Sequence, residues 1–467
     1  MSSAPQVPQP PQQYYYRRSM AGPLIMILLG VLFLLGNMHV VSWPSLGFWF
    51  ARWWPLILIV LGLVKLGEYW MAQQRGYRAP GIGGGTVMLL IFLCLFGFAA
   101  TRGARVNWNA VGNEMNWDNG DWSWWGESYT YSDQIEQPFP DGSSLQVVSD
   151  AGSVTVNAWD QKTIRVVVHK KIFSDAQSKA DQINPQTKPT ITTADKLLIV
   201  NANTTGGGGS SGRVRSDLEI FLPAAAAADL STRRGDIIVR NRAGDVKATT
   251  SRGDVTVEDV KGNATLNARG GSLVARSVTG DLELTGGRLD DTTISDVGGA
   301  VKLTGEFTGT TRLSKIAKGV QFTSSRTDLK FAKLDGEMMM DMGDLRANQL
   351  TGPFTIVTRS KDINLDGITG DVKVENTNGE VSISPGKGPV GNIEIDNHRG
   401  QVAVTLPSEA SFQVDLHTRR GEINSEFSGI SVNNTRGEAT GQGSVGKGGP
   451  KVTVNNDSGG VYLKKAG

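Results

Sequence analysis

The sequence has few of the residues that enzymes and metal proteins use. Cys94 is the only cysteine among 467 residues, which excludes an internal disulfide and a cysteine-based metal site. The four histidines are His39, His169, His398 and His417. No two of them have the spacing of a metal-ligand pair. The sequence therefore predicts no catalytic residue, no cofactor site and no metal site.

Neither sign of charge is in excess. The chain has 47 Lys and Arg residues against 45 Asp and Glu residues, a formal net charge of +2. This near balance gives no reason to expect a nucleic-acid partner or an acidic substrate. Glycine, in contrast, is abundant, with 58 residues that do not follow the three-residue period of collagen.

Three long apolar stretches lie near the N-terminus, at residues 22–41, 48–67 and 83–100. Each is close to the ~20 residues that a helix needs to cross ~30 Å of hydrocarbon. Ionisable residues deep inside a span are typical of transporters and proton relays, and these stretches have none at their centres. We therefore predict a Pro- and Gln-rich disordered tail at residues 1–20 and three transmembrane helices within residues 21–102, with the lipid bilayer as partner.

A tryptophan-rich neck follows at residues 103–137. Its five tryptophans are Trp108, Trp117, Trp122, Trp124 and Trp125. Tryptophan prefers the headgroup layer, so the neck is expected to rest on the membrane surface. Alternatively, these rings form a platform for a sugar or a lipid headgroup. They are the candidate ligand or membrane-interface residues of the chain.

A nine-residue repeat dominates the rest of the sequence. The stretch "RRGDIIVRNRAGDVKATTSRGDVTVEDV" (233–260) has Gly-Asp at residues 235, 244 and 253, and glycine recurs in the same step at 262, 271 and 280. The phase returns at 370 and 379, and again at 391 and 400. Apolar residues alternate after each glycine, as Val255 and Val257 do, which is typical of a strand with one buried face. Each unit is thus a strand of about five residues followed by a tight corner that needs glycine.

Nine residues cannot contain a crossover helix, so two all-β arrangements remain for residues 138–467. Pairs of units could form coils of about 18 residues, stacked ~4.8 Å apart as a parallel β-solenoid. Alternatively, successive strands could fold back as an antiparallel β-sandwich or meander. The fixed period favours the solenoid, because stacked coils repeat the same corner. We also expect a short helix at 174–183, irregular coils between 287 and 361, and two closing strands at 448–465 that cap the core.

The corner interpretation also explains the two Arg-Gly-Asp sequences, at 234–236 and 252–254. The same Gly-Asp pair follows Ala243, Thr279 and Thr369 elsewhere in the series. Arginine before the pair is therefore incidental, and a cell-attachment peptide is not needed to explain it. A phosphate-loop-like stretch at 441–447 lacks the Ser or Thr that should follow its lysine.

These patterns resemble two bacterial families. The opening "LQVVSDAGSVTV" (145–156) with repeated Gly-Asp-apolar corners resembles the putative-adhesin domain, a family of unknown function expected to form β-solenoid-like sheets. The stretches "PLIMILLGVLFLLGN" and "WWPLILIVLGLVKL" resemble the membrane region of LiaI/LiaF-type proteins, which act in responses to cell-envelope stress. The two resemblances cover most of residues 21–467 and imply no site residues.

The resemblance also bears on orientation. Arg17, Arg18, Arg75 and Arg78 flank one side of the predicted spans, and Arg52, Arg102 and Arg105 flank the other. With the resemblance, this count places the N-terminus inside and the C-terminal domain outside a bacterial cell membrane.

The expected function is that of a non-catalytic, multi-pass envelope protein. Its external β-solenoid would sense or scaffold in the cell-envelope stress response, with an envelope polysaccharide or a membrane sensor kinase as partner. The alternative is a surface adhesin that binds polysaccharide or another surface. The sequence does not indicate an oligomeric state.

Overall fold

The structure, a computed structural model, describes residues 127–204, 214–435 and 437–466. The predicted tail, the three predicted transmembrane helices and the five tryptophans of the neck lie outside these residues. None of the helices within the described ranges is long and apolar enough to cross a membrane. The first strand begins at Glu127, inside the predicted neck at residues 103–137.

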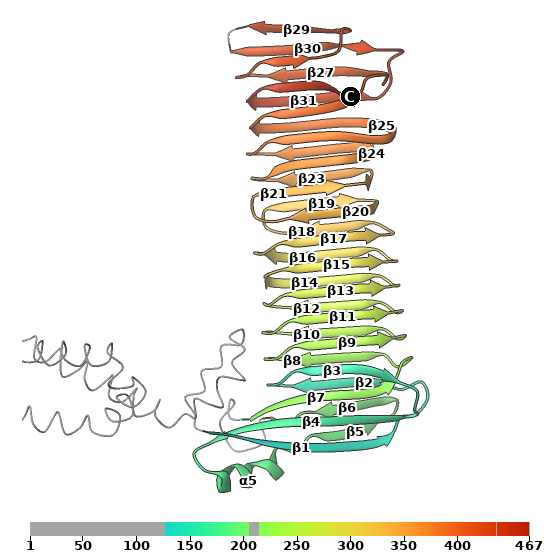
Figure 1. The fold of residues 1–467 in the computed structure, drawn as a ribbon, viewed down its shortest axis with the longest axis vertical. Coiled ribbons are helices and arrows are strands. Elements are labelled where there is room, and N and C mark those ends of the chain that lie inside the picture. Colours follow the sequence, from blue (N-terminus) through green and yellow to red (C-terminus); the bar gives the residue numbers. More distant parts are fainter. Residues whose placement is uncertain (1–126, 205–213, 436, 467) are drawn as a thin grey trace, which may run out of the picture. The chain divides into compact units, whose positions relative to one another are not determined.

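The described residues form a two-sided β-solenoid, in which each coil gives one strand to each of two stacks (Figure 1). The first stack contains β2 (Ser144–Ser149), β5 (Thr190–Ala194), β6 (Leu197–Asn201), β8 (Ala228–Thr232), β10 (Val246–Thr250), β12 (Ala264–Ala268), β14 (Leu282–Leu289), β16 (Val301–Phe307), β18 (Val320–Thr323), β19 (Thr327–Phe331), β23 (Phe354–Thr358), β27 (Phe412–Thr418), β29 (Ile430–Thr435), β30 (Glu438–Val445) and β31 (Lys451–Ser458).

The second stack lies on the other side of the core. It contains β1 (Glu127–Pro138), β3 (Val154–Trp159), β4 (Thr163–Ser174), β7 (Val214–Pro223), β9 (Ile237–Arg242), β11 (Val255–Val260), β13 (Leu273–Val278), β15 (Thr292–Val297), β17 (Thr311–Ile316), β20 (Lys333–Met340), β21 (Asp344–Asn348), β22 (Leu350–Thr351), β26 (Val402–Pro407), β28 (Ile423–Ser425) and β32 (Val461–Ala466). The long strands β24 (Asp362–Asn376) and β25 (Val381–Arg399) turn a corner and contribute to both stacks.

The predicted coil length is confirmed in the regular part of the solenoid. Val246 on β10 pairs in parallel with Ala228 on β8 and with Ala264 on β12, so each coil has 18 residues. Between β13 and β18 the coils lengthen to 19 residues, as the pairing of Leu273 with Thr292 shows. The parallel pairing decides for the solenoid and against the antiparallel meander in this region.

The core lies between the two stacks. Inward positions alternate with outward ones, so residues such as Val255 and Val257 are fully buried while Thr256 between them is not. Because the regular coils keep the same register, their inward side chains form columns along the solenoid. One column contains Val239, Val257, Ala275, Ile294 and Leu313. Burial of these columns is the main stabilising contribution to the fold.

One coil winds in the opposite direction, which we call the reversed coil (residues 327–340). The chain makes a hairpin after β18, so β19 runs antiparallel to β18, and β20 then runs antiparallel to β17. A second hairpin at residues 341–343 leads to β21 and restores the original direction, because β21 pairs in parallel with β24. The reversed coil lies within residues 287–361, where irregular coils were expected.

The N-terminal end is closed by antiparallel strands and a helix. The edge strand β1 pairs with β4, and α5 (Gln177–Gln186) packs Ala180 and Ile183 against Tyr129 and Tyr131 of β1. This helix corresponds to the short helix predicted at 174–183. Beneath it, the buried Lys170 ammonium donates to the backbone and side-chain oxygens of Asn184, and burial lowers the pKa of Lys170.

The C-terminal end differs from the expectation that residues 448–465 cap the core. Strands β31 and β32 form at this place, but they lie inside the solenoid, between the coil of β25 and β26 and the coil of β27 and β28. The cap is the hairpin of β29 and β30. The side chain of Asn434 on β29 bonds the backbone N–H and C=O of Ile423, so it replaces the missing neighbour of β28.

Candidate functional site

The Gly-Asp corners are places where neighbouring coils touch. Gly253 has a φ of 137°, in the region that favours glycine, as predicted from its place in the repeat. A Cβ on Gly253 would lie 2.2 Å from the carbonyl oxygen of Gly235 on the adjacent coil. Glycine is thus required both by the backbone angle and by the close approach of the next coil.

The aspartates of these corners join one coil to the next. The Asp236 carboxylate accepts a 2.9 Å hydrogen bond from the backbone N–H of Asp254, and the Asp254 carboxylate accepts one of 2.7 Å from Ser272. At the opposite corner, Asp245 accepts from the N–H of Asn263 in the same way. Their regular recurrence in the sequence predicts that these aspartates are turn residues. The structure adds that they bond the next coil and not their own turn.

Outward side chains on the two faces pair across neighbouring coils. The Glu258 carboxylate on β11 pairs with two arginines on the neighbouring strands. Its oxygens lie 3.0 Å from Nε of Arg240 on β9 and 3.3 Å from Nη1 of Arg276 on β13. On the other face, Lys302 of β16 bonds Glu283 of β14 at 2.7 Å. These pairs are solvent-exposed, so they contribute little to stability individually, but they leave the regular coils with locally balanced charge.

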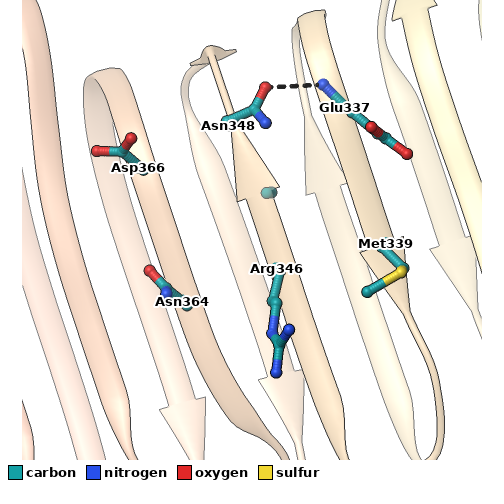
Figure 2. Close-up of a pocket in the computed structure, with 7 residues that line it drawn as sticks. Glu337, Met339, Arg346, Asn348, Asn364 and Asp366 are labelled. Carbon is teal, nitrogen blue, oxygen red and sulfur yellow. Dashed lines mark hydrogen bonds between the residues drawn. The ribbon is translucent and has the colours of Figure 1, made fainter.

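The reversed coil interrupts this charge pairing. Strands β20, β21 and β24 together form an open depression of about 310 Å³ on the outward side of the second stack (Figure 2). Its lining residues are Glu337, Met339, Arg346, Ala347, Asn348, Asn364 and Asp366.

The outward side chains of the depression form two rows across the three strands. One row runs from Met339 through Arg346 to Asn364, which are paired positions on adjacent strands. The other row contains Glu337, Asn348 and Asp366. We call these six residues the polar grid.

The hydrogen bonding of the polar grid is incomplete. The backbone N–H of Glu337 donates to Oδ1 of Asn348 at 2.9 Å, so the amide nitrogen of Asn348 remains available. Arg346 bonds Asp344 through one guanidinium nitrogen. Within the part of the chain that the structure describes, the side chains of Glu337, Asn364 and Asp366 have no hydrogen-bond or ion-pair partner.

The hairpin beside the polar grid is well anchored. The Asp341 carboxylate accepts two 2.8 Å hydrogen bonds, from the backbone N–H groups of Gly343 and Asp344, and these bonds lower the pKa of Asp341. The buried Lys361 ammonium donates to the carbonyl of Asp341, and burial lowers the pKa of Lys361. The turn that ends the reversed coil is thus held by its own Asp341 and by Lys361 from a neighbouring coil.

Residues singled out from the sequence are not part of the polar grid. The five tryptophans of the neck lie outside the described residues. His398 bonds Asp457 at 2.6 Å and His417 lies 3.6 Å from Glu438, both near the C-terminal end. The phosphate-loop-like stretch falls on β30 and the turn after it, which agrees with its rejection as a nucleotide site. Across the described ranges, no cluster of His, Cys, Asp or Glu could hold a metal ion.

The polar grid itself was not found from the sequence. Its six residues come from three strands, and β22 and β23 lie between β21 and β24 along the chain. None of the six belongs to the strict nine-residue series. The available signal was the loss of repeat phase between 287 and 361, which marked the irregular region but not its side chains.

Coils that stack in register, with aspartate hydrogen bonds from coil to coil at the corners and polar outward faces, define a β-solenoid repeat protein. The chain belongs to the Toastrack DUF4097 family, whose model matches residues 143–464. The model of the LiaI-LiaF-like transmembrane region matches residues 20–66, which contain the first predicted span and nearly all of the second. The protein is therefore membrane-associated, and the number of spans remains a prediction. No curated protein matches the chain.

The solved structures that match the chain are distant. A putative cell adhesion protein from Clostridium sporogenes has 9% identity and a TM-score of 0.17, over 73% of this chain and 100% of its own. A putative adhesin from Bacteroides fragilis has 10% identity and a TM-score of 0.21, over 72% and 97% of the two chains. A putative adhesin from Parabacteroides distasonis has 9% identity and a TM-score of 0.22, over 73% and 98%. Values this low carry no information about the function of this chain.

Proposed function

We propose that the protein is a multi-pass component of the bacterial cell envelope, whose solenoid lies outside the membrane and scaffolds or senses in the response to envelope stress. The observation that supports this proposal is the joining, in one chain, of a LiaI-LiaF-like transmembrane region to a stack of coils. A stack with fixed register offers long, regular faces, which suit binding of an extended or repetitive partner.

The scaffold has no catalytic role in this proposal. Its working parts are the outward faces and the polar grid, and its partner is an envelope polysaccharide or a membrane sensor kinase. The aspartate hydrogen bonds between corners support this role, because they hold neighbouring coils, and thus each outward face, in one register.

Fusions of alkaline phosphatase test the orientation. The enzyme is active only outside the cytoplasm, so a fusion after Gly467 should be active in a bacterial host. A fusion between residues 70 and 80 should be inactive, since this segment is expected inside. The opposite pattern would overturn the surface role.

Gene deletion tests the role in stress. Loss of the protein should change sensitivity to antibiotics that act on the cell wall while attachment to surfaces stays normal. Restoration by the full chain, but not by residues 1–102 alone, should show that the solenoid is required. Normal antibiotic sensitivity with impaired attachment would instead indicate the adhesin.

A further inference from the structure

The polar grid has both hydrogen-bond donors and acceptors. Glu337 and Asp366 offer only acceptors at neutral pH, whereas Arg346 and the amide nitrogen of Asn348 offer donors. Asn364 offers one group of each kind. A ligand that matches this surface must therefore both donate and accept hydrogen bonds.

The spacing of the two carboxylates argues against a single bound cation. Glu337 and Asp366 lie on strands that are two steps apart, with β21 between them. Strand neighbours are about 4.8 Å apart, so the two carboxylates are separated by roughly 10 Å. An ion such as Ca²⁺ needs its oxygen ligands at about 2.3–2.6 Å and could not bridge them.

The shape of the depression is also informative. It is open and spans three strands, and its volume of about 310 Å³ is at the lower end of the range for small-molecule sites. The two rows are two residues apart along the strands, roughly 7 Å. The half-buried Met339 thioether provides an apolar contact beside the polar groups (Figure 2).

We propose that the polar grid is a binding site for an uncharged saccharide segment. Sugar hydroxyl groups both donate and accept hydrogen bonds. They can donate to the carboxylates of Glu337 and Asp366, and they can accept from Arg346 and from the amide nitrogen of Asn348. The C–H face of a ring would lie against Met339. The cationic side chains of a basic peptide are donors only, so they would bond the carboxylates but could not accept from Arg346 or Asn348.

The reversal of the chain creates this site. In the regular coils, cations and carboxylates at equivalent positions meet on neighbouring coils, as Lys302 and Glu283 do. Antiparallel pairing puts Met339 opposite Arg312 and Arg346, and Glu337 opposite Ser314. Asp366 lies on β24, where its parallel partners are Asn348 and Ser384. Neither carboxylate of the polar grid thus faces a cation across the strands, and both remain free for a ligand.

This inference rests on the proposed function in one respect: the solenoid must lie outside the membrane, where envelope glycans are. The two can fail separately. Binding to the purified protein does not depend on orientation, whereas the phosphatase fusions report orientation and not binding.

The test uses the full-length protein in lipid nanodiscs. The probes are three neutral hexasaccharides (N-acetylchitohexaose, cellohexaose and maltohexaose) and, as a cationic competitor, hexalysine. Glu337→Gln and Asp366→Asn each remove a charge from the polar grid without changing side-chain size. Asp328→Asn is the matched control, because Asp328 is exposed on the same coil but belongs to the first stack.

At least one hexasaccharide should bind the unmodified protein, and each variant of the polar grid should weaken it about tenfold or more, as expected for lost hydrogen bonds to a charged group. Asp328→Asn should leave the affinity unchanged. Equal binding by all variants, or no binding of any hexasaccharide, would overturn the proposal. Binding of hexalysine alone, abolished by the same two substitutions, would overturn it in favour of a cationic partner.

Discussion

Substitution of Gly253 by valine tests the corner geometry most directly. At a φ of 137°, a β-branched residue should cost about 1–3 kcal/mol of unfolding free energy. The new Cβ would also lie 2.2 Å from the Gly235 carbonyl oxygen, so the two coils must separate. Separation weakens the 2.9 Å bond from Gly235 N–H to Arg252 O and the 2.9 Å bond from Asp254 N–H to Asp236. At about 0.5–1.5 kcal/mol each, these add up to a total loss of roughly 2–6 kcal/mol.

Urea unfolding with pulse proteolysis on the full-length protein in detergent would measure this loss. Gly142→Val is the matched glycine control, because Gly142 also has a positive φ, of 75°, but a Cβ on it would meet no atom within 4 Å. It should show the backbone penalty without the penalty of coil separation. Equal destabilisation by the two substitutions would refute the argument from close approach.

The exposed neighbour Arg252 provides a second control. Arg252→Ala destroys the same Arg-Gly-Asp sequence and should change stability by less than about 0.5 kcal/mol, as most surface substitutions do. If this folded variant lost binding to cells that the unmodified protein binds, the structural explanation of Arg-Gly-Asp would be wrong.

Two further predictions concern the C-terminal cap and the reversed coil. Asn434→Ala removes two hydrogen bonds from the edge of β28, so it should cost about 1–3 kcal/mol and cause association that rises with protein concentration in light scattering, whereas the exposed neighbour Asn433→Ala should do neither. The pKa of Asp341 is lowered in the folded state, so its stabilisation is complete above the ordinary carboxyl pKa and is lost as pH falls through the folded value. Thermal unfolding between about pH 5 and pH 2 should therefore be less acid-sensitive in Asp341→Asn, and an unchanged acid dependence would contradict the assignment.

The regular coils could be predicted because their information is local. The nine-residue glycine step and the alternation seen at Val255 and Val257 specify strand length, buried face and coil length together. Gly253 could be placed at a corner for the same reason.

The reversed coil could not be predicted in this way. Leu329 and Phe331 on β19, and Met338 and Met340 on β20, alternate with period two as any inward residues do. That period is the same for a strand that runs in either direction, so it carries no information about parallel or antiparallel pairing. The polar grid depends on the direction in which β20 runs, so it could not be predicted from the alternation of apolar residues.

The placement of the last strands depends on long-range pairing. Residues 451–466 have the same alternation as other coils, and nothing in them specifies which neighbours they join. In the structure Val452 pairs with Ile393 and Val414, residues 59 and 38 positions away. Such contacts depend on the whole fold and not on local sequence.

The inserted strands also determine the order in which the solenoid can be assembled. The coil of β27 and β28 precedes β31 and β32 in the sequence. Its neighbour on the side of β25 and β26 is formed by residues 451–466, so that side stays unpaired until these residues have been synthesised. A chain that emerges gradually from the ribosome or from a translocation channel can thus stack coils up to β26 as it appears. The final part must wait, with the inward residues Phe412, Val414 and Leu416 uncovered on one side, and it closes in a single step.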